Sequence, residues 1–194
     1  FAPAMLAVCI LLLNMGGLPR RALLQGATGG ILARGAALGG AVAATTRSIP
    51  PAVADASAAK LTGLSPKELA AMVQVDMDQN QFLVTGQLTR SIYDESATFK
   101  DEIDTYTLDK WIKGTGALFS APPRSFTEIV GDVSASDSEI RFRFNEVLCF
   151  NVPLNPKIPL TGEVILTRGD NGLITKYLEI WDTNLADTLK KTYF

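Results

Sequence analysis

The chain has 194 residues and a formal net charge of −2, but four of its 18 basic residues and only one of its 20 acidic residues lie within residues 1–58. Residues 59–194 are therefore acidic, with 14 basic and 19 acidic residues, and they lack the clustered Lys and Arg that nucleic acid requires. Histidine is absent, which removes the commonest zinc ligand and the side chain best suited to proton transfer at neutral pH, so we expect neither a metal ion nor a cofactor.

Residues 1–58 have the composition of a targeting leader. Met5–Met15 is an apolar run too short to cross a bilayer but long enough for a signal core. Arg20 and Arg21 precede a glycine-rich, mildly apolar stretch and resemble a twin-arginine signal for the thylakoid lumen. Ala52-Val53-Ala54 has the small-x-small pattern of a cleavage site. We expect a cleaved bipartite leader, and a location in a plastid (chloroplast), in the thylakoid lumen.

Two further features bear on this leader. The segment Phe1-Ala2-Pro3 resembles the residues that follow signal cleavage in plastids of secondary origin, where Phe is favoured. Alternatively, Ala22–Thr46 could be retained as a membrane helix. Arg34 within it would then cost about 2.5–3.5 kcal/mol at the bilayer centre, and its glycines weaken a helix further, so we favour cleavage.

Residues 59–194 are enough for one ordinary domain, and its first half predicts helices. Ser65–Glu68 forms a capping box with Pro at the first helical position, followed by the apolar stripe Leu69, Met72 and Val73. A short helix is expected over Leu88–Tyr93. The next helix begins near Thr107 and ends before Pro122-Pro123.

The second half predicts strands. Ile140–Phe144 alternates strictly, which places its phenylalanines on one face and Arg141 and Arg143 on the other. Gly169–Gly172 is a strong hairpin turn. The remaining expected elements are a strand over Leu160–Thr167, a last strand over Leu173–Asp182 and a closing helix over Leu185–Lys191. Helices followed by an antiparallel meander indicate an α+β fold.

The stretch Gln81–Asp101 joins a helical segment ending in Tyr93-Asp94 to a short β run, Ala97–Phe99, that stops on an acid. This join resembles the nuclear transport factor 2-like superfamily, which includes SnoaL-like cyclases, and is most similar to a plastid branch of plants and algae. The resemblance covers about residues 65–194, through the blocks Gln81–Thr89, Tyr93–Asp101, Thr107–Trp111, Gly162–Thr167 and Gly172–Asp182. It implies a cone-shaped α+β domain, with N-terminal helices packed on a curved antiparallel sheet around a conical pocket.

The resemblance also implies where a ligand would sit. Asp101 follows the first strand and Asp182 ends the last one, so either could act as a general base, with Tyr93 as a further alternative. Asp101 has an ordinary alternative role as a turn former, and its neighbours Lys100, Glu102 and Asp104 are typical of solvated surface. Asp182 could instead cap the closing helix. The pocket candidates are Tyr93, Phe99, Asp101, Tyr106, Trp111, Arg141, Arg143 and Trp181.

A calcium site and a reactive cysteine are both rejected. Asp76-x-Asp78-x-Asn80 starts like a calcium loop, but Gln81 replaces the expected glycine and no glutamate stands at the twelfth position. Cys149 lies in an apolar run and is expected to be a small buried thiol without a reactive role.

Three functions from different classes remain. The first is a non-enzymatic plastid accessory protein that binds a small apolar ligand or a protein of the photosynthetic membrane. The second is a small cofactor-free isomerase or cyclase that uses Asp101. The third is a structural homodimer formed through the sheet face, using alternate residues of Leu160–Leu166 and Leu173–Trp181. A cavity lined by Asp101 with a nearby Tyr hydroxyl would favour the enzyme, and a cavity filled by side chains would favour the structural dimer.

Overall fold

The computed structural model describes residues 59–194, so the predictions made for the leader lie outside the described residues. Within 59–194, no helix is both long enough and apolar enough to cross a membrane. The elements are α2 (Pro66–Asp78), α3 (Phe82–Thr85), the 3₁₀ turn η2 (Arg90–Ile92), β1 (Tyr93–Lys100), β2 (Thr105–Thr107), α4 (Leu108–Leu118), β3 (Phe126–Ala135), β4 (Glu139–Cys149), β5 (Lys157–Arg168), β6 (Ile174–Trp181) and α5 (Leu185–Lys190).

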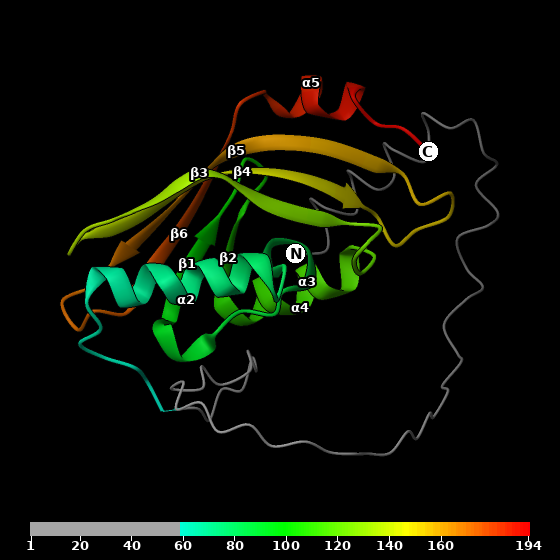
Figure 1. Cartoon of the computed structure of the whole chain (residues 1–194). Helices are drawn as coiled ribbons and strands as arrows, with labels where there is room; N and C mark the ends of the chain where they lie inside the picture. The colour runs from blue at the N-terminus through cyan, green and yellow to red at the C-terminus, as the bar shows by residue number, and fades with distance from the viewer. Residues whose placement is uncertain (1–58) are drawn as a thin grey trace, which may run out of the picture.

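The strands form one curved six-stranded sheet in the order β2-β1-β6-β5-β4-β3 (Figure 1). Helices α2, α3 and α4 lie against its inner face, and α5 follows β6 and lies along β5. This is an α+β arrangement with N-terminal helices packed on a curved sheet, as predicted. The sheet is mixed rather than wholly antiparallel, because β1 pairs in parallel with β6. These two strands are joined through most of the domain, so no hairpin forces them to run in opposite directions.

Helix α2 begins where the capping box predicts. The backbone N–H of Glu68 donates to Ser65 Oγ at 3.3 Å, and the backbone N–H of Ser65 donates to Glu68 Oε2 at 3.0 Å. Leu69, Val73 and Met77 are buried on the face that packs on the sheet. Local sequence therefore sets the position of α2, and its apolar stripe holds the helix in place.

The predicted helix Leu88–Tyr93 is shorter than expected. The structure has α3 before it and only the turn η2 within it, and β1 already starts at Tyr93. Gly86 ends α3 at φ 71°, and a Cβ on it would lie 2.4 Å from the carbonyl oxygen of Ile112 in α4. Both the positive φ and this close approach require glycine, so the chain turns here instead of continuing as a helix.

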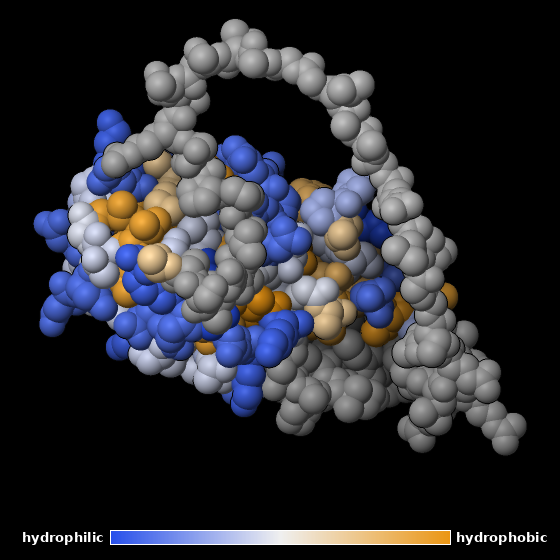
Figure 2. Space-filling view, turned by 90° about the horizontal axis from the view of Figure 1, so that it is seen from below, coloured by the Kyte–Doolittle hydropathy of each residue, from blue (hydrophilic) through white to orange (hydrophobic). Residues whose placement is uncertain are grey.

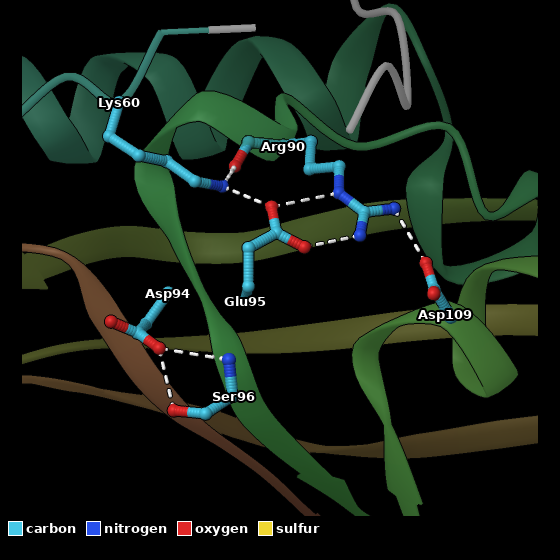
Figure 3. A network of polar contacts seen from close by, with 6 residues as sticks. All are labelled: Lys60, Arg90, Asp94, Glu95, Ser96 and Asp109. Carbon is cyan, nitrogen blue, oxygen red and sulfur yellow. Dashed lines mark hydrogen bonds and ion pairs between the residues drawn. The ribbon is translucent and has the colours of Figure 1, made fainter. Parts of the chain in front are cut away.

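A polar network joins the start of the described chain to this turn (Figure 3). The buried Arg90 guanidinium donates to both carboxylate oxygens of Glu95 and, at 2.7 Å, to Asp109 at the start of α4. Lys60 donates to the same Glu95 carboxylate and to the carbonyl oxygen of Arg90. The network fixes β1 relative to α4, two elements that border the cavity described below.

The core lies between the helices and the inner face of the sheet. Ile140, Phe142 and Phe144 point inward and are buried, as the alternation predicts. Phe99 of β1 stacks between Trp111 of α4 and Tyr177 of β6, with ring centroids 4.7 and 4.9 Å away. This stack forms one wall behind the cavity. On the helix side of the molecule, the described surface is mainly hydrophilic with separate apolar patches (Figure 2).

Candidate functional site

A cavity remains open between the inner face of the sheet and helices α4 and α5. The space open to the centre of a water-sized sphere is about 60 Å³. Strands β4, β5 and β6 and the turn after β1 supply its floor, and α5 closes it on the side where β6 has ended. Its lining residues are Leu83, Asp101, Ile103, Trp111, Thr115, Leu118, Phe119, Glu146, Leu148, Phe150, Ile158, Leu160, Glu179, Trp181, Leu185, Thr188 and Leu189.

Glu146 brings a carboxyl group into this apolar space. It continues the inward alternation of Phe142 and Phe144 along β4, and it is only 4% exposed. No hydrogen bond from any described residue reaches its side chain, which distinguishes it from the other acids of the cavity. Burial raises the pKa of Glu146 well above its ordinary value, and the nearby carboxyl groups of Glu179 and Asp101 raise it further.

Glu179 is the second acid, on β6. Tyr177 donates its hydroxyl to one carboxylate oxygen, and the indole N–H of Trp181 donates to the other at 2.6 Å. Burial raises the pKa of Glu179 to about 7, although these two hydrogen bonds favour the ionised form. This carboxyl group therefore changes its charge in the neutral pH range.

Asp101 is the third acid, just after β1. Its Oδ1 accepts the backbone N–H groups of Ile103 and Asp104, each at 2.8 Å, so it forms the turn into β2 as the sequence suggests. It also lines the cavity, and burial raises its pKa. The expectation of a solvated carboxyl group here is wrong, because Lys100 and Glu102 point away from the domain while Asp101 points inward.

The Tyr106 hydroxyl lies beside the Asp101 carboxyl group. Tyr106 pairs with Phe99 across β1 and β2 and is buried. Burial, and then the negative charge of Asp101, raise the pKa of Tyr106 above its ordinary value. Tyr106 therefore remains protonated at neutral pH and can interact with Asp101 as a donor.

Of the predicted pocket residues, only Asp101, Trp111 and Trp181 line the cavity. Tyr93 and Phe99 lie in the core behind it, with ring centroids 5.6 Å apart, and neither reaches the open space. Burial raises the pKa of Tyr93 well above its ordinary value, so its hydroxyl stays protonated at neutral pH, which disfavours a role as a base.

Arg141, Arg143 and Asp182 lie outside the cavity, and their assignment to it is corrected. They lie on the outer face of the sheet, because they are out of phase with the inward residues of their strands. Arg141 pairs with Glu139 at 2.6 Å and Arg143 with Asp182 at 2.6 Å. Asp182 does not cap α5 either.

The cap of α5 is Asn184, whose Oδ1 accepts the backbone N–H of Asp187 at 3.0 Å. Asp182 instead accepts hydrogen bonds from Arg143 and from the Thr161 hydroxyl. The outer face carries these ion pairs beside the exposed Ile180, whereas Leu160, Val164 and Leu166 point inward and are buried. A homodimer through the sheet face stays a prediction.

Sequence reasoning missed Glu146 and Glu179. Both were detectable, since Glu146 is in phase with Phe142 and Phe144, and Glu179 stands between the inward residues Tyr177 and Trp181. Within residues 59–194, no group of three or more acidic or Cys side chains is arranged to hold a metal ion. The three acids can instead exchange protons or bind polar groups of an organic molecule.

No protein-family model matches the chain, and no curated protein matches it. One similar solved structure is a predicted SnoaL-like polyketide cyclase from Jannaschia sp. CCS1, with 12% identity over 62% of this chain and 88% of the other, and a TM-score of 0.49. Another is AclR, a predicted hydroxylase from Streptomyces galilaeus, with 13% identity over 66% of this chain and 83% of the other, and a TM-score of 0.48.

Proposed function

We propose that this domain binds a small, largely apolar molecule in the cavity and acts as a non-enzymatic accessory protein. The observation that carries the proposal is an open cavity in which apolar side chains surround a few converging polar groups, an arrangement typical of ligand sites. A water molecule needs about 10–15 Å³ by the same measure, so the space exceeds that of a single trapped water. It is smaller than an engineered cavity of about 150 Å³ that binds benzene, so the enclosed part of the ligand is a short aliphatic group.

The tryptophans provide a direct test. The chain has two, Trp111 and Trp181, and both line the cavity. Each gives one indole N–H signal in a ¹H–¹⁵N NMR spectrum, so a ligand in the cavity should shift both signals. Native mass spectrometry of protein purified from its source should show a retained molecule.

A matched pair of variants locates the binding. Leu160→Phe adds volume inside the cavity and should abolish the shifts, whereas Ile165→Phe adds the same kind of side chain on the outer face of β5 and should leave them unchanged. Circular dichroism checks that both variants are folded. If ligands bind equally well to both variants, the cavity is not the binding site.

We propose a plastid location for this function, in the thylakoid lumen next to a photosynthetic membrane complex. The support is in the leader sequence, where Arg20-Arg21 and Ala52–Ala54 have the pattern of a lumen signal with a cleavage site. N-terminal sequencing of protein from isolated plastids should find a start between Asp55 and Ala59. A membrane-bound protein that retains Ala22–Thr46 would contradict this location.

A second candidate function is that of a cofactor-free isomerase or cyclase. The arrangement expected of the enzyme, a cavity lined by Asp101 with a tyrosine hydroxyl nearby, is present, because Tyr106 lies beside Asp101. Asp101 would take a proton from a carbon next to a carbonyl group, and a protonated Glu146 would donate to the carbonyl oxygen. Turnover on a panel of small ketones and epoxides, lost in a folded Asp101→Asn variant, would establish this function in place of the accessory role.

A further inference from the structure

The cavity contains three acids and no base. Glu146 and Glu179 enter it from β4 and β6, Asp101 enters it from the turn after β1, and no Lys or Arg is present in its lining. The segments that close it from the other side contribute only apolar and hydroxyl side chains, including Thr115 of α4 and Thr188 of α5. The basic side chains that pair with nearby acids, such as Arg143 with Asp182, lie on the outer face of the sheet. Three acids thus share one enclosed space without a cation from residues 59–194.

Glu146 is the least satisfied of the three. Glu179 receives hydrogen bonds from Tyr177 and Trp181, and Asp101 receives two from the backbone. Glu146 is 96% buried and lines the cavity, yet no donor among the described residues reaches it. A buried carboxyl group without a donor is unfavourable, and a donor arriving with a ligand would remove that cost.

Aromatic rings surround the same space. Trp111 comes from α4, Trp181 ends β6, and Phe119 and Phe150 pair edge to face with centroids 5.2 Å apart. The faces of aromatic rings attract organic cations, and aromatic cages are the usual sites for quaternary ammonium groups. The lining therefore combines the two features that favour a positively charged organic group.

We propose that the ligand of this cavity is a small aliphatic amine, bound as its ammonium ion with the charge directed at Glu146. This inference rests on the proposed function, since it names the chemical class of the molecule that the cavity holds. The ammonium group donates hydrogen bonds to Glu146, and its short alkyl part packs against Leu148 and Leu160. A carboxylate ligand would bring a further acidic group into this acidic space and should be rejected.

A metal ion is a poorer candidate ligand for these acids than an ammonium ion. A metal must be contacted by several ligands at once, and the acids within residues 59–194 do not form such a group. An ammonium ion needs only one close carboxylate and can use the aromatic faces for the rest of its surroundings. The arrangement of the acids therefore favours the organic cation over a metal ion.

The test uses three probes of nearly the same size: isobutylamine, isobutanol and isobutyrate. Each is titrated in the millimolar range into the protein at pH 8, and the Trp111 and Trp181 indole signals are followed by NMR. We expect isobutylamine to bind at least about tenfold more tightly than isobutanol, because its hydrogen bond is charge-assisted, and isobutyrate not to bind. Glu146→Gln should remove most of the tenfold advantage of the amine while isobutanol binds as before.

Glu128→Gln is the matched control, because it removes one negative charge from the exposed side of β3 and should change nothing. If isobutanol binds as tightly as isobutylamine, or if Glu146→Gln leaves the amine affinity unchanged, the amine inference is overturned and the binding function stands. If none of the three probes shifts the indole signals, both the inference and the proposed function fail.

Discussion

The indole N–H of Trp181 donates to Glu179 Oε1 over 2.6 Å, on the wall of the cavity. A tryptophan signal thus reports the charge of an acid inside the site. This contact connects the electrostatics of the cavity to a measurable quantity.

The Trp181 indole signal should titrate with a midpoint near pH 7, because the pKa of Glu179 is raised to about 7 by burial. Above that pH, the ionised carboxylate accepts a stronger hydrogen bond and the indole proton should move downfield. The measurement is a series of ¹H–¹⁵N spectra from pH 5 to 9. Glu179→Gln should remove the titration, and Trp111→Phe, which assigns the two signals, should leave it in place. If the chemical shift of the Trp181 indole does not change over this range, the pKa of Glu179 is not raised towards 7.

Stability should be higher at pH 5 than at pH 8. Glu179 has a folded pKa near 7 and an ordinary pKa of 4.5, so between these values the folded protein holds a proton that the unfolded chain releases. The free energy of unfolding therefore falls as pH rises from about 4.5 to 7 and changes little above. Asp101 and Glu146 act in the same direction, and the chain has no histidine to oppose them.

Urea denaturation at the two pH values checks this sign. Glu146→Gln and Glu179→Gln should each reduce the difference between the midpoints, and Glu128→Gln should not. A wild-type midpoint that is higher at pH 8 would contradict the raised pKa values.

These acids also show what the sequence could and could not predict. The capping box Ser65–Glu68 and the alternation Ile140–Phe144 are local patterns, and the structure has α2 and β4 where they indicate. Glu146 follows the same alternation, but a charged residue in phase with a core face was not considered as part of the site. The alternation of β4 therefore predicts that Glu146 faces inward, although charged residues usually face solvent.

Other features depend on contacts between distant parts of the chain. The parallel pairing of β1 with β6 joins Phe99 to Tyr177, and no local pattern specifies it. Asp101 has charged neighbours in sequence, but its own direction is set by the turn that it forms with Ile103 and Asp104. The family resemblance predicts Arg143 as a pocket residue, but the alternation of β4 places it outward, where the structure has it.

Asp76→Ala should destabilise the domain by about 2–4 kcal/mol, since it leaves a buried donor without its acceptor. Asp76 on α2 is buried and accepts from the backbone N–H and the hydroxyl of Thr89, each at 2.7 Å, and from Asn80 at 2.8 Å. It therefore ties α2 to the segment that leads into β1. The control is Asp78→Ala, an exposed position on the same helix, which should change the free energy of unfolding by less than about 0.5 kcal/mol. Equal urea midpoints for the two variants would show that the hydrogen bonds of Asp76 do not contribute to stability.

Glu95 should control stability at acid pH. Its ion pairs with Arg90 and Lys60 (Figure 3) lower its pKa from 4.5 to about 2. Because the folded pKa is the lower one, the stabilisation is complete above about pH 4.5 and is lost as pH falls towards 2. Glu95→Gln should therefore be less stable than wild type at pH 6, and the two proteins should converge near pH 2. Thermal unfolding at both pH values measures this, and a constant difference between them would mean that the charge of Glu95 is not involved.

Asp101→Asn should separate the structural role of this residue from its electrostatic role. The amide oxygen of Asn can still accept the N–H groups of Ile103 and Asp104, so we expect a loss of at most about 1 kcal/mol, whereas Asp101→Ala removes the acceptor and should lose about 1–3 kcal/mol. The charge of Asp101 also raises the pKa of Glu179, so Asp101→Asn should move the titration of the Trp181 signal to lower pH.

The same variant then shows whether the charge of Asp101 acts on the other acids of the cavity. An unchanged Trp181 midpoint in a folded Asp101→Asn protein would mean that the carboxyl group is screened from Glu179, and that its only role is to form the turn before β2. A lowered midpoint would mean that the carboxyl groups of Asp101 and Glu179 interact across the cavity. In that case a bound ammonium ion, which stabilises ionised carboxylates, should lower the midpoint in the wild type as well.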